Sequence, residues 1–142
     1  MAKTMTLTVD TGAVTIEVTD KSGKHLGEFS FIPSDSDILN RYEQVVDFFN
    51  AISFPENMTK DQSMKALRQL GDDVRKQLDI LLGAGVSDTL FASCGPLTPL
   101  ENGDFFFENV MDGIGNLIAE TTQQRLNKKM KKISAAVKKY RK

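Results

Sequence analysis

Few residues of this chain have side chains that commonly do catalytic chemistry. The sequence contains one histidine, His25, and one cysteine, Cys94. Neither lies in a motif typical of a nucleophile and its base, and a Cys–His couple would need the fold to bring two distant residues together. Zinc sites draw on several histidines and cysteines. We therefore expect no enzyme, no bound metal and no cofactor, and interpret the two residues as a surface imidazole and a packed thiol.

Two pairs of neighbouring aspartates could suggest a metal site from the sequence alone. Asp35 and Asp37 stand near the start of an expected helix, where negative charge is favourable beside the free amide groups. Asp72 and Asp73 lie off the apolar stripe of another expected helix. We interpret the first pair as capping residues and the second as part of a solvated helix surface.

Positive charge gathers at the C-terminal end of the chain. From Arg125 onward there are nine basic residues and no acidic one, whereas the residues before it include nine basic and nineteen acidic ones. The formal net charge of −1 therefore combines a +9 tail with a −10 body. Such a division can attract other copies of the chain or an anionic partner.

The residues that follow the Asn102-Gly103 turn carry the longest helical pattern in the chain. Asp104 is expected to cap this helix, while Gly113 and Gly115 permit a bend without requiring one. Near the end, apolar residues recur at intervals of four and three, the spacing of a seam that packs on a partner helix. These residues are Leu126, Met130, Ile133, Val137 and Tyr140.

The basic end has three interpretations. It could be a solvated helix face, with lysine stems covering the seam. It could neutralise nucleic-acid phosphates, or it could dock in a groove of a protein partner or of a second copy. Aromatic side chains are scarce there and the acidic body would repel a polyanion, so we favour docking over nucleic-acid binding.

Three consecutive phenylalanines open the same helix. Phe105, Phe106 and Phe107 cover too much of its circumference for one buried stripe, so one ring should face a partner or a loop. The predicted partner-binding residues are Phe105, Phe106, Leu126, Lys128, Lys129, Met130, Lys131, Lys132, Ile133, Val137, Lys138, Lys139, Tyr140 and Arg141.

The first 32 residues alternate apolar and polar side chains. Strands are expected within residues 4–32, around Met5–Val9, Val14–Val18 and His25–Ile32, with a bulge at Gly27. Together they predict a three-stranded antiparallel meander, which needs a helix on its apolar face.

Helical patterns fill most of the remaining sequence. Helices are predicted over residues 35–53, with Ser34 as cap, and over 60–82, with Thr59 as cap. A short helical turn is expected within 87–91, and a further helix over 105–122. The predicted class is α+β: a globular body over 1–122 and a basic amphipathic helical extension over 123–142.

The sequence contains no apolar run long enough for a membrane span or a signal peptide. A single cysteine is typical of a reducing compartment. We therefore expect a cytoplasmic protein with no membrane partner.

Three segments carry a resemblance to a known group of proteins. They are FSFIPSDSDILNRYE (residues 29–43), ILLGAGVSDTLF (80–91) and GDFFFENVMDGI (103–114), followed by the lysine-rich end. In this order they resemble small proteins of Gram-positive tailed phages and prophages that are associated with tail genes, similar to tail assembly chaperones or tail morphogenesis factors. The resemblance implies a non-enzymatic protein that binds virion or assembly proteins, such as a tape-measure-type partner. The alternative is a phage-encoded inhibitor, or a nucleic-acid-binding or nucleic-acid-mimicking protein, that acts on a host system.

Overall fold

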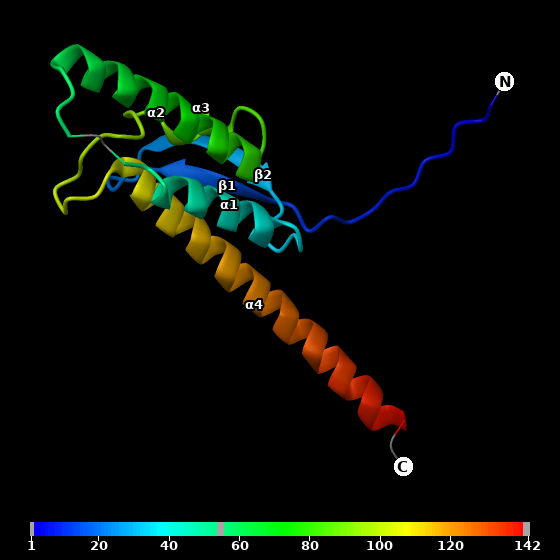
Figure 1. Cartoon of the computed structure of the whole chain (residues 1–142). Coiled ribbons are helices and arrows are strands. Elements are labelled where there is room, and N and C mark those ends of the chain that lie inside the picture. Colours follow the sequence, from blue (N-terminus) through cyan, green and yellow to red (C-terminus); the bar gives the residue numbers. More distant parts are fainter. Residues whose placement is uncertain (1, 54–55, 141–142) are drawn as a thin grey trace.

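The structure is a computed structural model that describes residues 2–53 and 56–140. A two-stranded antiparallel sheet, β1 (Val14–Thr19) and β2 (His25–Phe31), precedes four helices. The helices are α1 (Ile38–Asn50), α2 (Lys60–Leu82), α3 (Val86–Leu90) and α4 (Phe106–Tyr140). Figure 1 shows the sheet and the first three helices gathered around the beginning of α4, while the rest of α4 extends away from them. The predicted α+β class is confirmed.

The predicted three-stranded meander is wrong, because its first strand does not form. Residues 2–13 have no regular secondary structure, and Met5 and Leu7 are 85% and 87% exposed. Alternation shows that a segment could form a strand with one apolar face, but it does not supply a neighbouring strand or a surface to cover that face. The sheet therefore contains two strands.

The pairing of β1 with β2 confirms the expected bulge. Val18 lies opposite Gly27, whereas Thr19 lies opposite His25, so Leu26 is the extra residue. Gly27 has a φ of 152°, which side-chain-bearing residues rarely adopt. The extra residue restores the phase that places Phe29 and Phe31 on the buried face of the sheet.

The helix caps differ in part from the prediction. At the start of α2, Thr59 and Gln62 form the expected capping box, with bonds of 3.1 and 3.0 Å. Ser34 does not cap α1: the N-cap is Asp37, and the Ser34 hydroxyl instead accepts a bond from Arg125. The Ser34 hydroxyl therefore makes a tertiary contact with Arg125 and does not cap the helix as the sequence predicted.

The start of α4 also differs from the prediction. The carboxylate of Glu108 accepts a hydrogen bond of 2.7 Å from the Phe105 amide, whereas the Asp104 carboxylate accepts one from Asn102. Glu108 thus binds the amide of the residue before the helix, whereas the Asp104 carboxylate, expected to cap the helix, bonds to Asn102 instead. From Phe106 the helix continues through Gly113 and Gly115 without interruption, and its 35 residues rise about 52 Å.

One hydrophobic core joins the sheet to the helices. Side chains from β2, all four helices and the residue that follows α3 meet in it. Its buried members are Phe29, Phe31, Ile38, Val45, Val74, Leu78, Leu81, Leu82, Val86, Leu90, Phe91, Phe107, Met111, Ile114 and Ile118. The first half of α4 is thus part of the body, which fixes the direction in which its second half leaves.

Candidate protein-docking surface

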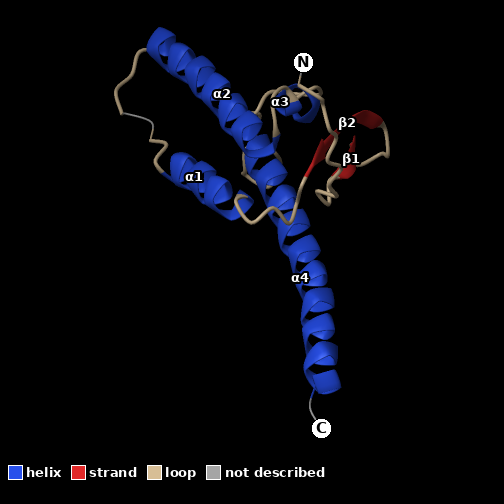
Figure 2. Ribbon diagram, turned by 90° about the vertical axis from the view of Figure 1, so that its right-hand side faces the viewer, coloured by secondary structure: helices blue, strands red, loops and turns tan. Residues whose placement is uncertain are grey.

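The helix α4 has a buried half and a projecting half. Phe107, Met111, Ile114 and Ile118 are buried in the core, whereas every residue from 126 to 139 is exposed. Figure 2 shows this second half extending beyond the other elements. The boundary predicted at residue 122 falls within a continuous helix, so the division is one of burial and not of secondary structure.

Arg125 fixes the point at which α4 leaves the body. Its Nη1 donates to the Gly12 carbonyl at 2.9 Å and to the Ser34 hydroxyl at 2.8 Å. One turn earlier, the Thr122 hydroxyl donates to the Pro33 carbonyl at 3.4 Å. The sequence prediction counted Arg125 only as part of the basic tail, whereas the structure makes it an anchor between α4 and two loops.

Removal of this anchor should lower stability modestly. We expect Arg125→Ala to reduce the free energy of unfolding by about 1–2 kcal/mol, because two hydrogen bonds from a charged donor are lost from a half-buried site. Lys128→Ala, at an exposed position on the same helix, should change it by no more than about 0.5 kcal/mol. Urea unfolding followed by circular dichroism checks both values, and equal effects would argue against the anchor.

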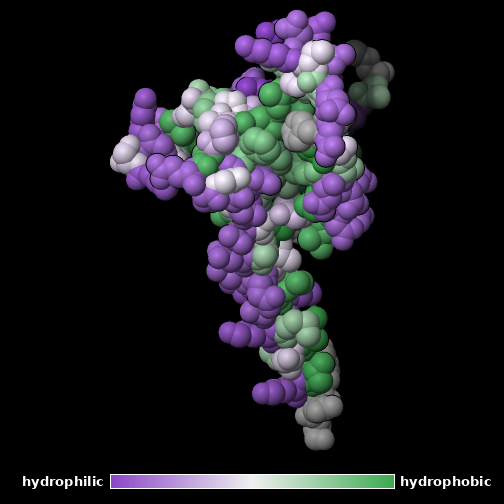
Figure 3. Space-filling model, turned by 60° about the vertical axis from the view of Figure 1, so that its left-hand side comes forward, coloured by the Kyte–Doolittle hydropathy of each residue, from purple (hydrophilic) through white to green (hydrophobic). Residues whose placement is uncertain are grey.

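The projecting half carries an apolar stripe, which we call the α4 seam. Its residues Leu126, Met130, Ile133 and Val137 are 55%, 58%, 43% and 47% exposed. Figure 3 shows apolar surface along one side of the projecting helix and polar surface along the other. The described lysines of the predicted set, Lys128, Lys129, Lys131, Lys132, Lys138 and Lys139, are also exposed. The Tyr140 side chain and Arg141 lie outside the described residues.

The seam continues onto the body as a groove between α1 and α4. This α1–α4 groove is lined by Leu39 and Tyr42 from α1 and, among others, by Gly115, Ala119 and Thr122 from α4. At 3.6 residues per turn, the three α4 residues and the seam fall within about 80° of the helix circumference. The sequence prediction missed this groove, although the helical spacing of Gly115 and Ala119 from Leu126 was a signal for it.

Tyr42 crosses the groove toward α4. An added Cβ at Gly115 would lie 2.5 Å from the Tyr42 hydroxyl, so only glycine admits the ring in this position. Burial, and to a lesser degree the Asp112 carboxylate, raise the pKa of the Tyr42 phenol above its ordinary value. The phenol donates to the Met111 carbonyl at 3.5 Å.

The phenylalanine cluster packs mainly inward. Phe107 is buried, while Phe105 and Phe106 are partly buried against the core. Phe105 stacks on Phe107 with ring centres 6.0 Å apart, and Phe106 meets Phe91 edge-on at 5.9 Å. The apolar surface that remains open on α4 is therefore mostly the seam.

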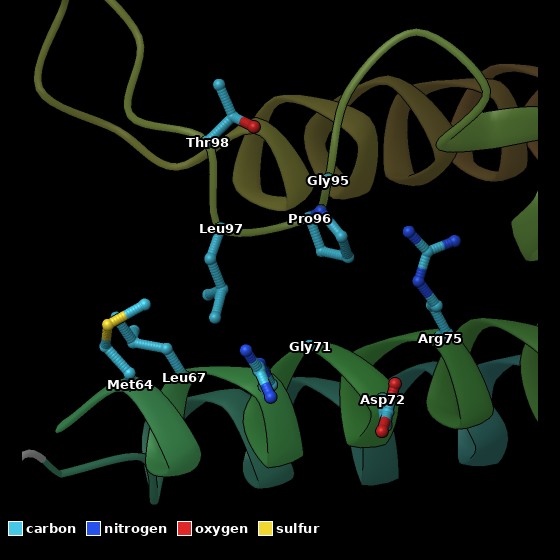
Figure 4. A pocket seen from close by; sticks show the side chains of 10 residues that line it. Met64, Leu67, Gly71, Asp72, Arg75, Gly95, Pro96, Leu97 and Thr98 are labelled. Carbon is cyan, nitrogen blue, oxygen red and sulfur yellow. The ribbon is translucent and has the colours of Figure 1, made fainter. Parts of the chain in front are cut away.

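A second hollow lies between α2 and the loop at 95–98. In Figure 4 Leu97 and Pro96 face α2, from which Met64 and Leu67 point toward them. Arg75 lies at one end, with its guanidinium carbon 5.3 Å from the centre of the Phe91 ring. This lining is mainly apolar, with the charged residues Arg68, Asp72 and Arg75 along α2.

The residues considered for catalysis are placed as follows. His25 Nδ1 lies 3.5 Å from Glu17 Oε1, with both side chains more than half exposed, and Cys94 is partly buried. Asp35 accepts a bond from the Asp37 amide and another from Arg41, and the pKa of its carboxyl is lowered by these bonds in that order. Across residues 2–53 and 56–140, no three His, Cys, Asp or Glu side chains gather to hold a metal ion.

Comparisons with known proteins give no relative for this chain: no protein-family model, no curated protein and no solved structure matches it. None of the helices, as far as their residues are described, combines the length and the apolar character that crossing a membrane requires.

Proposed function

We propose that this protein is a non-catalytic binding protein of phage tail assembly that docks through its projecting α4 helix on a virion or assembly protein, such as a tape-measure-type partner. The tail-assembly context rests on the resemblance carried by segments 29–43, 80–91 and 103–114. The docking mode rests on the α4 seam, and this is the observation that carries the proposal.

The form of the seam supports a helical partner. Leu126, Met130 and Ile133 follow the four–three spacing with which one helix packs on another. Four large apolar side chains exposed in one line are a surface that a partner helix would cover. A partner lying along them would continue into the α1–α4 groove, beside Ala119 and Thr122.

The charges around the seam favour an acidic partner surface. The chain has nine basic and no acidic residues from Arg125 to its end. Opposite charges beside an apolar contact chiefly speed association and fix its orientation. We therefore expect the bound helix to carry acidic residues on the sides of its apolar stripe.

The experiment is a binding measurement with the tape-measure protein encoded in the same genome. Met130→Glu combined with Ile133→Glu should weaken binding at least about 100-fold, since it places two charges in the apolar contact. Gln124→Glu combined with Ala135→Glu adds the same charge on the opposite, exposed face and should change binding less than about threefold. Circular dichroism should show equal helix content in both variants.

Two results would overturn this proposal. One is equal binding by the seam variant and its control, which would remove the seam as the contact. The other is the lack of any tape-measure gene in the same genome, which would remove the tail-assembly context.

The alternative function is a phage-encoded inhibitor or nucleic-acid-binding protein that acts on a host system. The exposed lysines of α4 favour it, because each could neutralise a phosphate. Binding to DNA or RNA would then fall steeply as salt rises, and the seam variant and its control would weaken it about equally, because each adds two negative charges to the basic helix. A flat salt response would exclude the nucleic-acid version.

A further inference from the structure

The N-terminal arm, residues 2–13, is an extended segment without regular structure. Met5, Leu7 and Val9 alternate with threonines along it and are 85%, 87% and 65% exposed. Threonine and valine favour strands, and the alternation would place the three apolar side chains on one face of a strand. A segment with this pattern and with exposed apolar side chains lacks a neighbouring strand and a surface that covers those side chains.

Contacts at Gly12 hold the arm where it joins the body. The Gly12 amide donates to Asp10 Oδ1 at 2.9 Å, and its carbonyl accepts from Arg125 at 2.9 Å. Gly12 has a φ of 72°, and an added Cβ there would lie 2.7 Å from Arg125 Nη1. From this held point the arm leads away from the body (Figure 1).

The strand that follows the arm has an open edge. β1 pairs with β2 on one side only, and the sheet contains no third strand among the described residues. The described backbone hydrogen bonds outside helices and strands include none from Val14–Thr19. The amides and carbonyls of β1 that point away from β2 therefore lack a backbone partner among the described residues.

We propose that the N-terminal arm pairs with the free edge of β1 in a second copy of this chain, and that two copies exchange their arms. The segment from Thr4 to Val9 has six residues, the same number as β1. Paired there, Met5, Leu7 and Val9 would extend the half-buried apolar layer formed by Val14, Ile16 and Val18. Each copy would then contain a three-stranded sheet, completed by its neighbour.

The contacts at the arm's base favour a second copy over the same one. To fold back on its own β1, the arm would have to reverse its direction within residues 10–13, whereas in the structure Gly12 is bonded to Asp10 and Arg125 and the arm leads away from the body (Figure 1). Pairing with another copy keeps those bonds. Because two arms are exchanged, each copy contributes the six residues of its arm segment and the six of β1 to the contact.

The test is the mass of the full chain in solution, measured by light scattering over a range of concentrations. A dimer is expected for the unchanged protein. Met5→Lys combined with Leu7→Lys should raise the dissociation constant of the dimer at least about tenfold, because it charges the apolar face of the arm. Thr6→Lys combined with Thr8→Lys adds the same charge on the other face and should change it less than about threefold.

Further variants separate this interface from the α4 seam. Met130→Glu combined with Ile133→Glu should leave the dimer intact, whereas deletion of residues 2–9 should give a folded monomer. The proposal is overturned if the unchanged chain is a monomer at every concentration, including a monomer whose arm amides resist hydrogen exchange because the arm has folded back on its own β1. It is also overturned if both lysine pairs act equally, or if only the seam variant dissociates the dimer.

Discussion

Replacing Leu78 by alanine should lower the free energy of unfolding by about 3–5 kcal/mol. Leu78 is fully buried in α2, where it belongs to the core that joins the sheet to all four helices. Truncation removes apolar contacts and leaves a cavity that close-packed neighbours fill only in part. The measurement is urea unfolding of the purified variant, monitored by circular dichroism at 222 nm.

A matched substitution on the same helix tests the reason for this effect. Leu67 is 42% exposed at the hollow between α2 and the 95–98 loop, so Leu67→Ala should cost about 1 kcal/mol or less. A loss at Leu78 no larger than the loss at Leu67 would show that α2 does not pack as described. The comparison also tests whether that hollow is open in solution, since a covered Leu67 would cost more.

Helices with a long apolar stripe were the part of this fold that the sequence could predict. The helix expected over 60–82 matches α2, because its apolar positions repeat over about five turns and both ends carry strong signals, Thr59 before it and Gly83 after it. The helix expected over 35–53 is observed as Ile38–Asn50, which is shorter at both ends. The predicted cap residue, Ser34, accepts a hydrogen bond from Arg125, which lies 91 positions away in the sequence. No local sequence pattern reveals such a contact.

The first predicted strand failed for a different physical reason. A helix satisfies its own backbone hydrogen bonds, whereas a strand depends on a neighbour that the sequence pattern does not name. The segment around Leu7 has the alternation of a strand but no described partner. In our proposal the pattern is a true strand signal whose partner belongs to another copy of the chain.

The candidate docking surface was also partly predictable from the sequence. The four–three spacing of Leu126, Met130, Ile133 and Val137 indicated a helix face without a partner inside the chain, and these residues are exposed in the structure. The α1–α4 groove was not predicted, because it depends on how closely α1 approaches α4. That approach is set by Tyr42 above Gly115, which is a tertiary contact.

Replacing Gly27 by alanine should lower the free energy of unfolding by about 3–5 kcal/mol. The residue lies at the bulge of β2, where its φ of 152° is strained for any side-chain-bearing residue. In addition, the new Cβ would lie 2.6 Å from Cγ2 of Thr89 in α3. Threonine is branched at Cβ and has few χ1 states, so its methyl group cannot turn away freely, and overpacking of this kind costs about 1–3 kcal/mol.

Two companion variants separate the backbone cost at Gly27 from the steric cost. Gly23→Ala changes a turn glycine with a φ of 88° and no other atom within 4 Å of the new Cβ, so it should cost only about 1–2 kcal/mol. Thr89→Ser removes the opposing methyl group, and in combination with Gly27→Ala it should recover about 1–3 kcal/mol of the loss. If Gly27→Ala costs no more than Gly23→Ala, or if Thr89→Ser recovers nothing, then Thr89 of α3 does not pack against the bulge as described.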